Sequence, residues 1–260
     1  MYENEITVCK YLAIEAGSAI MKIYEVGSAQ NIKYKNDNSP LTAADEASNK
    51  IIVNGLKDHF PEYAILSEEE KDNKKRLNND YCFVIDPLDG TKEFIKRNGQ
   101  FTVNIALSYK HRVVMGVIYV PVTKELYFAS LGAGAFYTNT KGETVQIHVS
   151  DNTDHNNLRT VVSSSHPCDE MEQIIKKYGI KNLIRMGSSL KGCLVAEGTA
   201  DIYFRHNPTM EWDTAAMQCI VEEAGGIFKQ MDDSEMTYNR ECSVNDKGFY
   251  AINKLENRLH

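Results

Sequence analysis

One stretch decides the fold of this chain, residues 84–94, which read Val84-Ile85-Asp86-Pro87-Leu88-Asp89-Gly90-Thr91-Lys92-Glu93-Phe94. The run just before it, residues 81–85, is apolar and rich in β-branched and aromatic side chains, as a buried strand is. Because Pro87 has no amide hydrogen to continue a sheet ladder, we expect the strand to end at Asp86. The Gly-Thr pair that follows turns the chain into a predicted helix that begins at Lys92.

The two carboxylates of this stretch, three residues apart, have the chemistry of a metal site. Asp86 and Asp89 supply hard oxygen ligands, and the turn can aim the carbonyl of Leu88 at the same cation. The first amides of the following helix attract a phosphate group. The alternative is structural, with Asp86 ending a strand and Asp89 forming an ordinary turn with Gly90. Two anionic ligands, a rigid proline and a hydroxyl together favour the metal site, provided that further carboxylates complete it.

The composition is that of a globular protein. The 260 residues can bury a large core, and no apolar run is long enough to cross a bilayer. A formal net charge of −7 at pH 7 argues against a nucleic-acid polymer as the partner, since such binding needs clustered cations. Residues 1–5 lack the basic and apolar parts of a signal peptide, so we expect a cytoplasmic protein with no integral membrane association. The alternative is a peripheral position at the inner membrane. Reduced thiols are predicted because no Cys-x-x-Cys pair occurs among Cys9, Cys82, Cys168, Cys193, Cys219 and Cys242.

Two helices are predicted before the central stretch. Apolar residues at helical spacing predict an amphipathic helix over residues 5–24 and a second helix over residues 43–60. Asp45 lies in the first turn of the second helix. Without further information, complementing the helix dipole is the simplest explanation of its charge.

A short strand and a charged segment complete the N-terminal part. The strand is predicted at residues 63–66, and Glu68 follows it, where a carboxylate can turn back over the sheet edge. We expect the charged residues 72–80 to form a solvated, mobile flap.

The pattern changes to strands after residue 100 and to alternating strands and helices after residue 157. An antiparallel sheet is indicated by five predicted strands, at residues 101–109, 113–121, 125–129, 135–137 and 145–149. An α/β region is indicated by strands at 160–163, 183–185, 201–204, 227–228 and 249–252 and helices at 169–178, 189–197 and 213–224. The polar break between them divides a metal-binding α+β region, residues 1–150, from an α/β region with the substrate pocket, residues 151–260. The alternative is one continuous core.

Carboxylates elsewhere in the chain complete the pattern. With Asp45, Glu68, residues 86–91 (DPLDGT) and residues 211–216 (EWDTAA), the chain resembles the inositol monophosphatase superfamily of metal-dependent, lithium-sensitive phosphatases. The resemblance covers nearly the whole length. Three strings look most like the bacterial 3'(2'),5'-bisphosphate nucleotidases of this superfamily: residues 86–106 (DPLDGTKEFIKRNGQFTVNIA), 187–191 (GSSLK) and 208–213 (PTMEWD).

The resemblance implies a fold and a set of site residues. The fold is α+β or α/β, a layered αβαβα sandwich of the sugar-phosphatase type. Two or three Mg²⁺ ions are held by Glu68, Asp86, the carbonyl of Leu88, Asp89 and Asp213. Asp45 and Thr91 orient and deprotonate a water molecule. The residues implied in substrate binding are Glu68, Leu88, Asp89, Gly90, Thr91, His166, Ser188, Lys191, Arg205 and Asp213.

The activity that the resemblance implies is that of a Mg²⁺-dependent phosphatase, which removes the 3'-phosphate of 3'-phosphoadenosine 5'-phosphate to give AMP and phosphate and so clears a by-product of sulfate assimilation. Inositol monophosphate and fructose 1,6-bisphosphate are the alternative substrates. A second alternative is a non-catalytic sensor of nucleotide or metal. It is motivated by two departures from the family pattern, Met217 where a glycine is usual and Gly192 inside a helix where a bulky residue is common. We expect a small phosphorylated nucleotide as the partner, and a monomer or homodimer.

Overall fold

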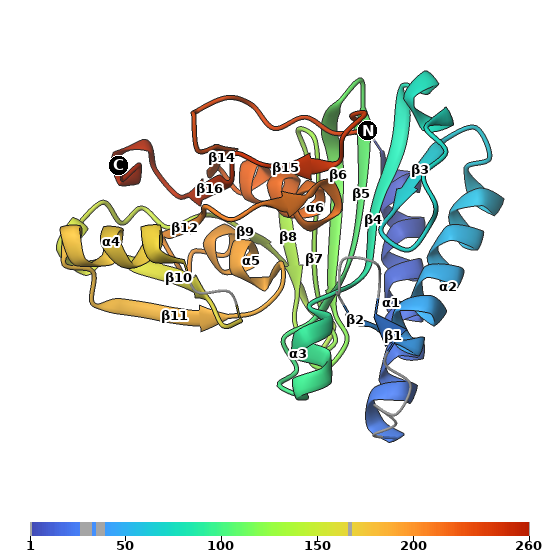
Figure 1. The fold of residues 1–260 in the computed structure, drawn as a ribbon, viewed down its shortest axis with the longest axis horizontal. Coiled ribbons are helices and arrows are strands. Elements are labelled where there is room, and N and C mark those ends of the chain that lie inside the picture. The colour runs from blue at the N-terminus through green and yellow to red at the C-terminus, as the bar shows by residue number, and fades with distance from the viewer. Residues whose placement is uncertain (1, 27–32, 35–39, 166–167, 260) are drawn as a thin grey trace.

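Five layers alternate between helices and sheets in the computed structural model, which describes residues 2–26, 33–34, 40–165 and 168–259 (Figure 1). From one side to the other they are α1 (Glu3–Val26) with α2 (Ala43–His59), a seven-stranded sheet, α5 (Leu190–Ala196) with α6 (Glu211–Glu223), a five-stranded sheet, and α4 (Asp169–Tyr178). This order is the predicted αβαβα sandwich.

The seven-stranded sheet is antiparallel except for its first pair, β3 and β4, which are parallel. Its strands follow one another in chain order: β3 (Ala64–Ser67), β4 (Tyr81–Asp89), β5 (Thr102–Tyr109), β6 (Arg112–Val120), β7 (Glu125–Ser130), β8 (Gly134–Thr138) and β9 (Thr144–Ile147). The antiparallel sheet predicted after residue 100 is therefore confirmed.

The five-stranded sheet contains all the strands predicted after residue 157. Its order in space is β11 (Asn182–Met186), β10 (Arg159–Ser163), β12 (Ile202–Arg205), β16 (Phe249–Ile252) and β14 (Ile227–Gln230). Elements of two to six residues make up the rest, and most of them are too short for a sequence pattern: β1 (Lys33–Tyr34), β2 (Pro40–Leu41), α3 (Thr91–Lys96), β13 (Thr209–Met210), β15 (Val244–Asn245) and the 3₁₀ turns Lys75–Asn78, His155–Asn157 and Leu255–Asn257.

Strand β4 is buried on both faces because helices cover both sides of its sheet. Phe83 and Ile85 pack toward α1 and α2, whereas Val84, between them, packs toward α5 and α6. The hydrophobic cluster that contains Val84 also contains Val161 and Tyr203 from the five-stranded sheet. Both parts of the chain thus contribute to one core around α6, and the division into two regions at residue 150 stays a prediction.

The prediction that the strand ends at Asp86 is wrong. Strand β4 continues to Asp89, with Asp86 opposite Asn104 and Asp89 opposite Thr102 on β5. Two residues on β4 therefore lie where β5 has one, and Pro87 is in this bulge. A bulge leaves a residue out of the ladder, so the missing amide hydrogen of proline costs nothing there.

The prediction of a solvated flap over residues 72–80 is wrong for Arg76, whose side chain is buried. Its guanidinium donates to Oδ1 of Asn239 and to the carbonyl of Arg240, each at 2.8 Å, and pairs with Asp72 at 2.8 Å. The charged segment is thereby fixed to a loop far along the chain. The sequence pattern shows the charges but not this partner.

All six cysteines are free, in agreement with the predicted reduced thiols. Four are buried, Cys168 is half-buried and Cys242 is exposed. Burial raises the pKa of the Cys82 thiol to about 12, which keeps it protonated and unreactive. Among the described residues, no helix is long and apolar enough to cross a membrane.

Candidate active site

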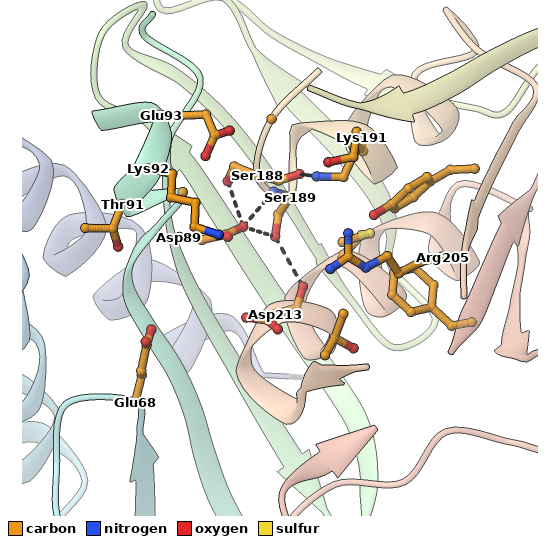
Figure 2. Close-up of a pocket in the computed structure, with 17 residues that line it drawn as sticks. Glu68, Asp89, Thr91, Lys92, Glu93, Ser188, Ser189, Lys191, Arg205 and Asp213 are labelled. Carbon is orange, nitrogen blue, oxygen red and sulfur yellow. Dashed lines mark hydrogen bonds between the residues drawn. The ribbon is translucent and has the colours of Figure 1, made fainter. Parts of the chain in front are cut away.

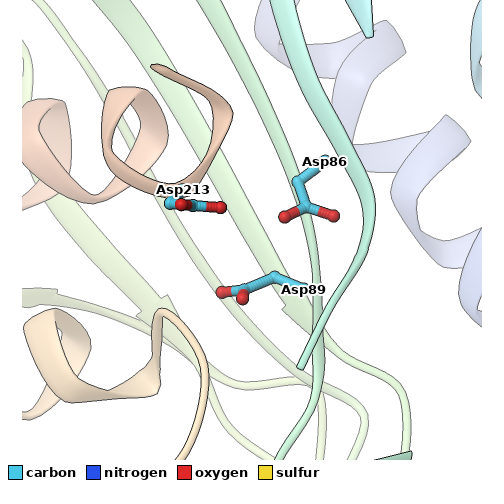
Figure 3. A group of neighbouring side chains, drawn as sticks. All are labelled: Asp86, Asp89 and Asp213. Carbon is cyan, nitrogen blue, oxygen red and sulfur yellow. The ribbon is translucent and has the colours of Figure 1, made fainter. Parts of the chain in front are cut away.

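Three aspartates from two elements converge at the end of β4 (Figure 3). Asp86 and Asp89 come from the bulged end of this strand, and Asp213 comes from the first turn of α6. One carboxylate oxygen of each lies within 4.8 Å of the others. Because the bulge adds a residue, both strand aspartates reach the same side, toward α6.

Backbone amides fix two of these carboxylates. The amide of Leu88 donates to Oδ1 of Asp86 at 3.1 Å, and the amide of Met210 donates to Oδ2 of Asp213 at 2.7 Å. Asp213 is the third residue of its helix, so this bond also satisfies an amide at the helix start. Amides only two or three residues away in the sequence thus orient these two carboxylates.

The electrostatics show that these carboxylates fit a divalent cation. Burial, and then the charges of Glu68, Asp89 and Asp213, raise the pKa of Asp86 well above its ordinary value. Burial and the Asp89 charge raise the pKa of Asp213 to about 7. The protein therefore gathers more negative charge than it neutralises, and Mg²⁺, which prefers carboxylate and carbonyl oxygens, would supply the missing positive charge.

Glu68 stands directly after β3, as predicted, and its amide donates to the carbonyl of Ile85 at 3.2 Å. It lines the same cavity as Asp89 and Asp213 and lies outside the group of three whose oxygens are within 4.8 Å of one another. Its charge nevertheless contributes to the raised pKa of both Asp86 and Asp213. Its role as a metal ligand stays a prediction.

Two serines, shown in Figure 2, and the asparagine Asn104 hold Asp89. Its Oδ2 accepts from the hydroxyls of Ser188 and Ser189, each at 2.7 Å, and from the amide of Ser189 at 2.6 Å. The side chain of Asn104 adds a longer contact of 3.3 Å to the same oxygen. These donors fix the carboxylate and leave its Oδ1 for a cation. Neither Asn104 nor Ser189 was predicted from the sequence as a site residue, although both lie in strings that carry the resemblance, residues 86–106 and 187–191.

Asp45 and Thr91 meet beside the cluster of aspartates. The Asp45 side chain is buried, and its Oδ2 accepts from the amide of Thr42 at 2.8 Å and from the Thr42 hydroxyl at 2.6 Å. Its Oδ1 accepts from the hydroxyl of Thr91 at 3.3 Å. Burial raises the pKa of Asp45 in spite of the Thr42 hydrogen bonds. The Asp45 carboxylate therefore lies at the start of α2, where its charge complements the helix dipole, and it also contacts the predicted partner Thr91.

Gly90, the N-cap residue just before helix α3, has a backbone conformation that favours glycine. Its φ is +92°, and an added Cβ would lie 3.0 Å from the carbonyl oxygen of Gln100. The helix begins at Thr91, one residue before the predicted start at Lys92.

Asp89 and Asp213 border a cavity of about 270 Å³ (Figure 2). Lys191 and Arg205 line it on the side opposite Glu68 and Thr91. Burial lowers the pKa of Lys191 to about 8, and its Nζ donates to the carbonyl of Ser188 at 2.5 Å. The cavity is lined by Glu68, Asp89, Gly90, Thr91, Lys92, Glu93, Ser163, Gly187, Ser188, Ser189, Lys191, Tyr203, Arg205, Thr209, Asp213, Met217 and Phe249. His166, predicted to contact substrate, lies outside the described residues.

The family model of the inositol monophosphatases, described as "Inositol monophosphatase family", matches residues 1–256. The chain belongs to this family. The chain is 41% identical over 243 residues to the 3'(2'),5'-bisphosphate nucleotidase CysQ of Salmonella typhimurium, which covers 93% of this chain and 96% of the relative. CysQ of Escherichia coli K12 is 40% identical with the same coverage.

Solved structures of the family share the fold. The crystal structure of CysQ from Bacteroides thetaiotaomicron superimposes with a TM-score of 0.83 at 41% identity and covers 98% of both chains. SuhB from Bartonella henselae also gives a TM-score of 0.83, at 25% identity, over 97% of this chain and 95% of its own. The layered sandwich implied by the sequence resemblance is therefore confirmed as the inositol monophosphatase fold.

Proposed function

We propose that this protein is a Mg²⁺-dependent phosphatase that removes the 3'-phosphate of 3'-phosphoadenosine 5'-phosphate, giving AMP and phosphate. One observation carries the proposal: three aspartates cluster together, and two of them, Asp89 and Asp213, border a cavity whose opposite side presents Lys191 and Arg205. The likeness to the CysQ nucleotidases over 93% of the chain supports the same substrate class. The proposal includes a cytoplasmic location and a monomer or homodimer.

The metal-binding residues in this proposal are Asp86, Asp89 and Asp213, with Glu68 and the carbonyl of Leu88 as further ligands. Mg²⁺ held by these residues would polarise a phosphoryl oxygen and would lower the pKa of a coordinated water. The serine and asparagine donors to Asp89 keep that carboxylate in place during turnover.

The proton acceptor in this proposal is the pair Thr91 and Asp45. The Thr91 hydroxyl accepts the proton of the attacking water while it donates its own hydrogen to Oδ1 of Asp45, with 3.3 Å between the two oxygens. As the water oxygen bonds to phosphorus, the bond from phosphorus to the ribose 3'-oxygen breaks, and the 3'-oxygen takes a proton from a solvent water. The raised pKa of Asp45 makes it a better base than an exposed carboxylate. Gly90 lets the chain approach the scissile phosphate closely, because it has no side chain to exclude it.

The second phosphate of the substrate explains Lys191 and Arg205. A bisphosphate places one phosphate at the aspartates and the other against these two cations, whereas inositol monophosphate has no second anion to pair with them. Fructose 1,6-bisphosphate also carries two phosphates and remains the stronger alternative.

The test compares phosphate release from the three substrates with Mg²⁺ present. We expect kcat/KM for 3'-phosphoadenosine 5'-phosphate to exceed the other two by at least about tenfold. Lys191→Met should raise KM for the nucleotide while leaving turnover of inositol monophosphate nearly unchanged, and Lys191→Arg should retain most of the nucleotide activity. A tenfold preference for either alternative substrate contradicts the nucleotide assignment.

A separate experiment addresses the alternative of a non-catalytic sensor. Thr91→Ala should abolish turnover while calorimetry still detects nucleotide binding in the presence of Ca²⁺ or Mg²⁺. A wild-type protein that binds the nucleotide without measurable phosphate release supports the sensor instead.

A further inference from the structure

Helices α5 and α6 meet beside the cavity at Gly192 and Met217. A Cβ added to Gly192 would lie 2.1 Å from Cγ and 2.3 Å from Sδ of Met217. The Met217 side chain therefore occupies the space that a side chain at position 192 would fill. Met217 is only 3% exposed, yet it contributes to the cavity wall.

The pair lies between the two ends of the cavity. Met217 follows Asp213 by four residues, so both project from the same face of α6. Gly192 follows Lys191 on α5, and Lys191 lines the cavity as well. The contact between these two helices thus sets the wall that runs from the metal-binding aspartates to the cations.

We propose that Gly192 and Met217 together determine which phosphate esters this pocket accepts, an inference that rests on the proposed function. The absence of a side chain at Gly192 lets the thioether of Met217 withdraw from the cavity, which leaves room for the group that joins the two phosphates. The wall that remains is largely apolar, because Tyr203 and Phe249 line the same cavity and belong to the same core cluster as Met217.

An apolar wall favours a furanose over a cyclic polyol. The ribose of the nucleotide has one free hydroxyl, so few of its polar groups lose a partner against an apolar wall. Inositol monophosphate has a free hydroxyl on each of its remaining ring carbons, and these hydroxyls would lose hydrogen bonds to water against methionine and phenylalanine. A buried group that loses such a bond costs about 1–3 kcal/mol. The pair therefore disfavours inositol phosphates and favours nucleotides.

Two single variants and one double variant test this inference. Gly192→Ala forces Met217 toward the cavity, so we expect KM for 3'-phosphoadenosine 5'-phosphate to rise about tenfold or more. Combining it with Met217→Ala removes the clash and should return KM to within about threefold of wild type. Met217→Gln keeps the size but adds a polar amide, and should shift the ratio of kcat/KM toward inositol monophosphate by about tenfold.

A readout at the metal end separates specificity from general damage. Inorganic phosphate needs only the aspartate end of the cavity, so its inhibition constant should stay within about twofold in all three variants. A lower unfolding temperature with unchanged KM and unchanged substrate ratio would show that the pair only packs two helices, and would overturn the inference. Failure of the wild type to hydrolyse the nucleotide would instead contradict the proposed function.

Discussion

Replacing Asp213 by asparagine should make the metal-free protein more stable and the enzyme inactive. Burial and the Asp89 carboxylate raise the pKa of Asp213 from 3.8 to about 7. The folded protein keeps a proton that the unfolded chain releases, so this group contributes stability at low pH that is lost as the pH rises from 3.8 through about 7. At 1.36 kcal/mol per pH unit, the ionised carboxylate destabilises the folded state by up to about 4 kcal/mol above that range.

Urea unfolding at pH 8 in EDTA measures this effect directly. Asparagine can still accept the Met210 amide hydrogen and carries no charge, so we expect Asp213→Asn to raise the free energy of unfolding by about 1–4 kcal/mol. Mg²⁺ at about 100 times its dissociation constant should stabilise the wild type by about 2.7 kcal/mol and the variant far less. Phosphate release should fall at least about a hundredfold in the variant.

Asp201 provides the control, because its side chain is buried but is surrounded by hydrogen-bond donors and a cation instead of other carboxylates. Burial alone would raise the pKa of Asp201, yet hydrogen bonds from Arg159, Ser150 and Asn152 outweigh it and hold the pKa below its ordinary value. Asp201→Asn should therefore lower the free energy of unfolding by about 1–3 kcal/mol and leave the Mg²⁺ response unchanged. An Asp213→Asn variant less stable than wild type at pH 8 in EDTA would refute this account of the carboxylate cluster.

Three further predictions concern Lys191, Arg76 and the effect of lithium at the carboxylate site. The Lys191 pKa of about 8 means that kcat/KM for the bisphosphate should fall as the pH rises through about 8, and Lys191→Arg should remove this fall. Arg76→Met should lower the free energy of unfolding by about 2 kcal/mol because it leaves buried partners unpaired, whereas Lys74→Met, which removes an exposed pair with the same Asp72, should change stability by less than about 0.5 kcal/mol; urea unfolding of both variants measures the difference. Lithium has half the charge of Mg²⁺, so it should inhibit more strongly as phosphate accumulates, and inhibition no stronger than that by equal sodium would contradict the crowded carboxylate site.

Much of the fold was predictable because its signals are local and repeated. The helix predicted over residues 169–178 has the same bounds as α4, since apolar residues at helical spacing are followed by a glycine at the end. The strand, the turn and the two aspartates around residue 86 lie within one short segment, so a metal site could be predicted there without knowledge of distant residues. The predicted end of β4 at Asp86 was wrong, because a bulge depends on the neighbouring strand as much as on Pro87.

The supporting contacts of the site could not be predicted from spacing alone. Ser189 is 100 residues from Asp89 in sequence, and Arg76 is 163 residues from Asn239. Gly192 and Met217 each stood out singly as unusual, but only the packing of α5 against α6 shows that one makes room for the other. Such complementary pairs depend on the tertiary fold, which no local pattern contains.

The measurement that tests the central claim most directly is ³¹P NMR of 3'-phosphoadenosine 5'-phosphate incubated with the wild-type protein and Mg²⁺. We predict that the 3'-phosphate signal disappears, inorganic phosphate appears in equal amount, and the 5'-phosphate signal persists as AMP. The same sample with EDTA, or with Asp86→Asn in place of the wild type, should remain unchanged. Loss of the 5'-phosphate first, or phosphate release that persists in EDTA, would contradict metal-dependent 3'-phosphate hydrolysis at this site.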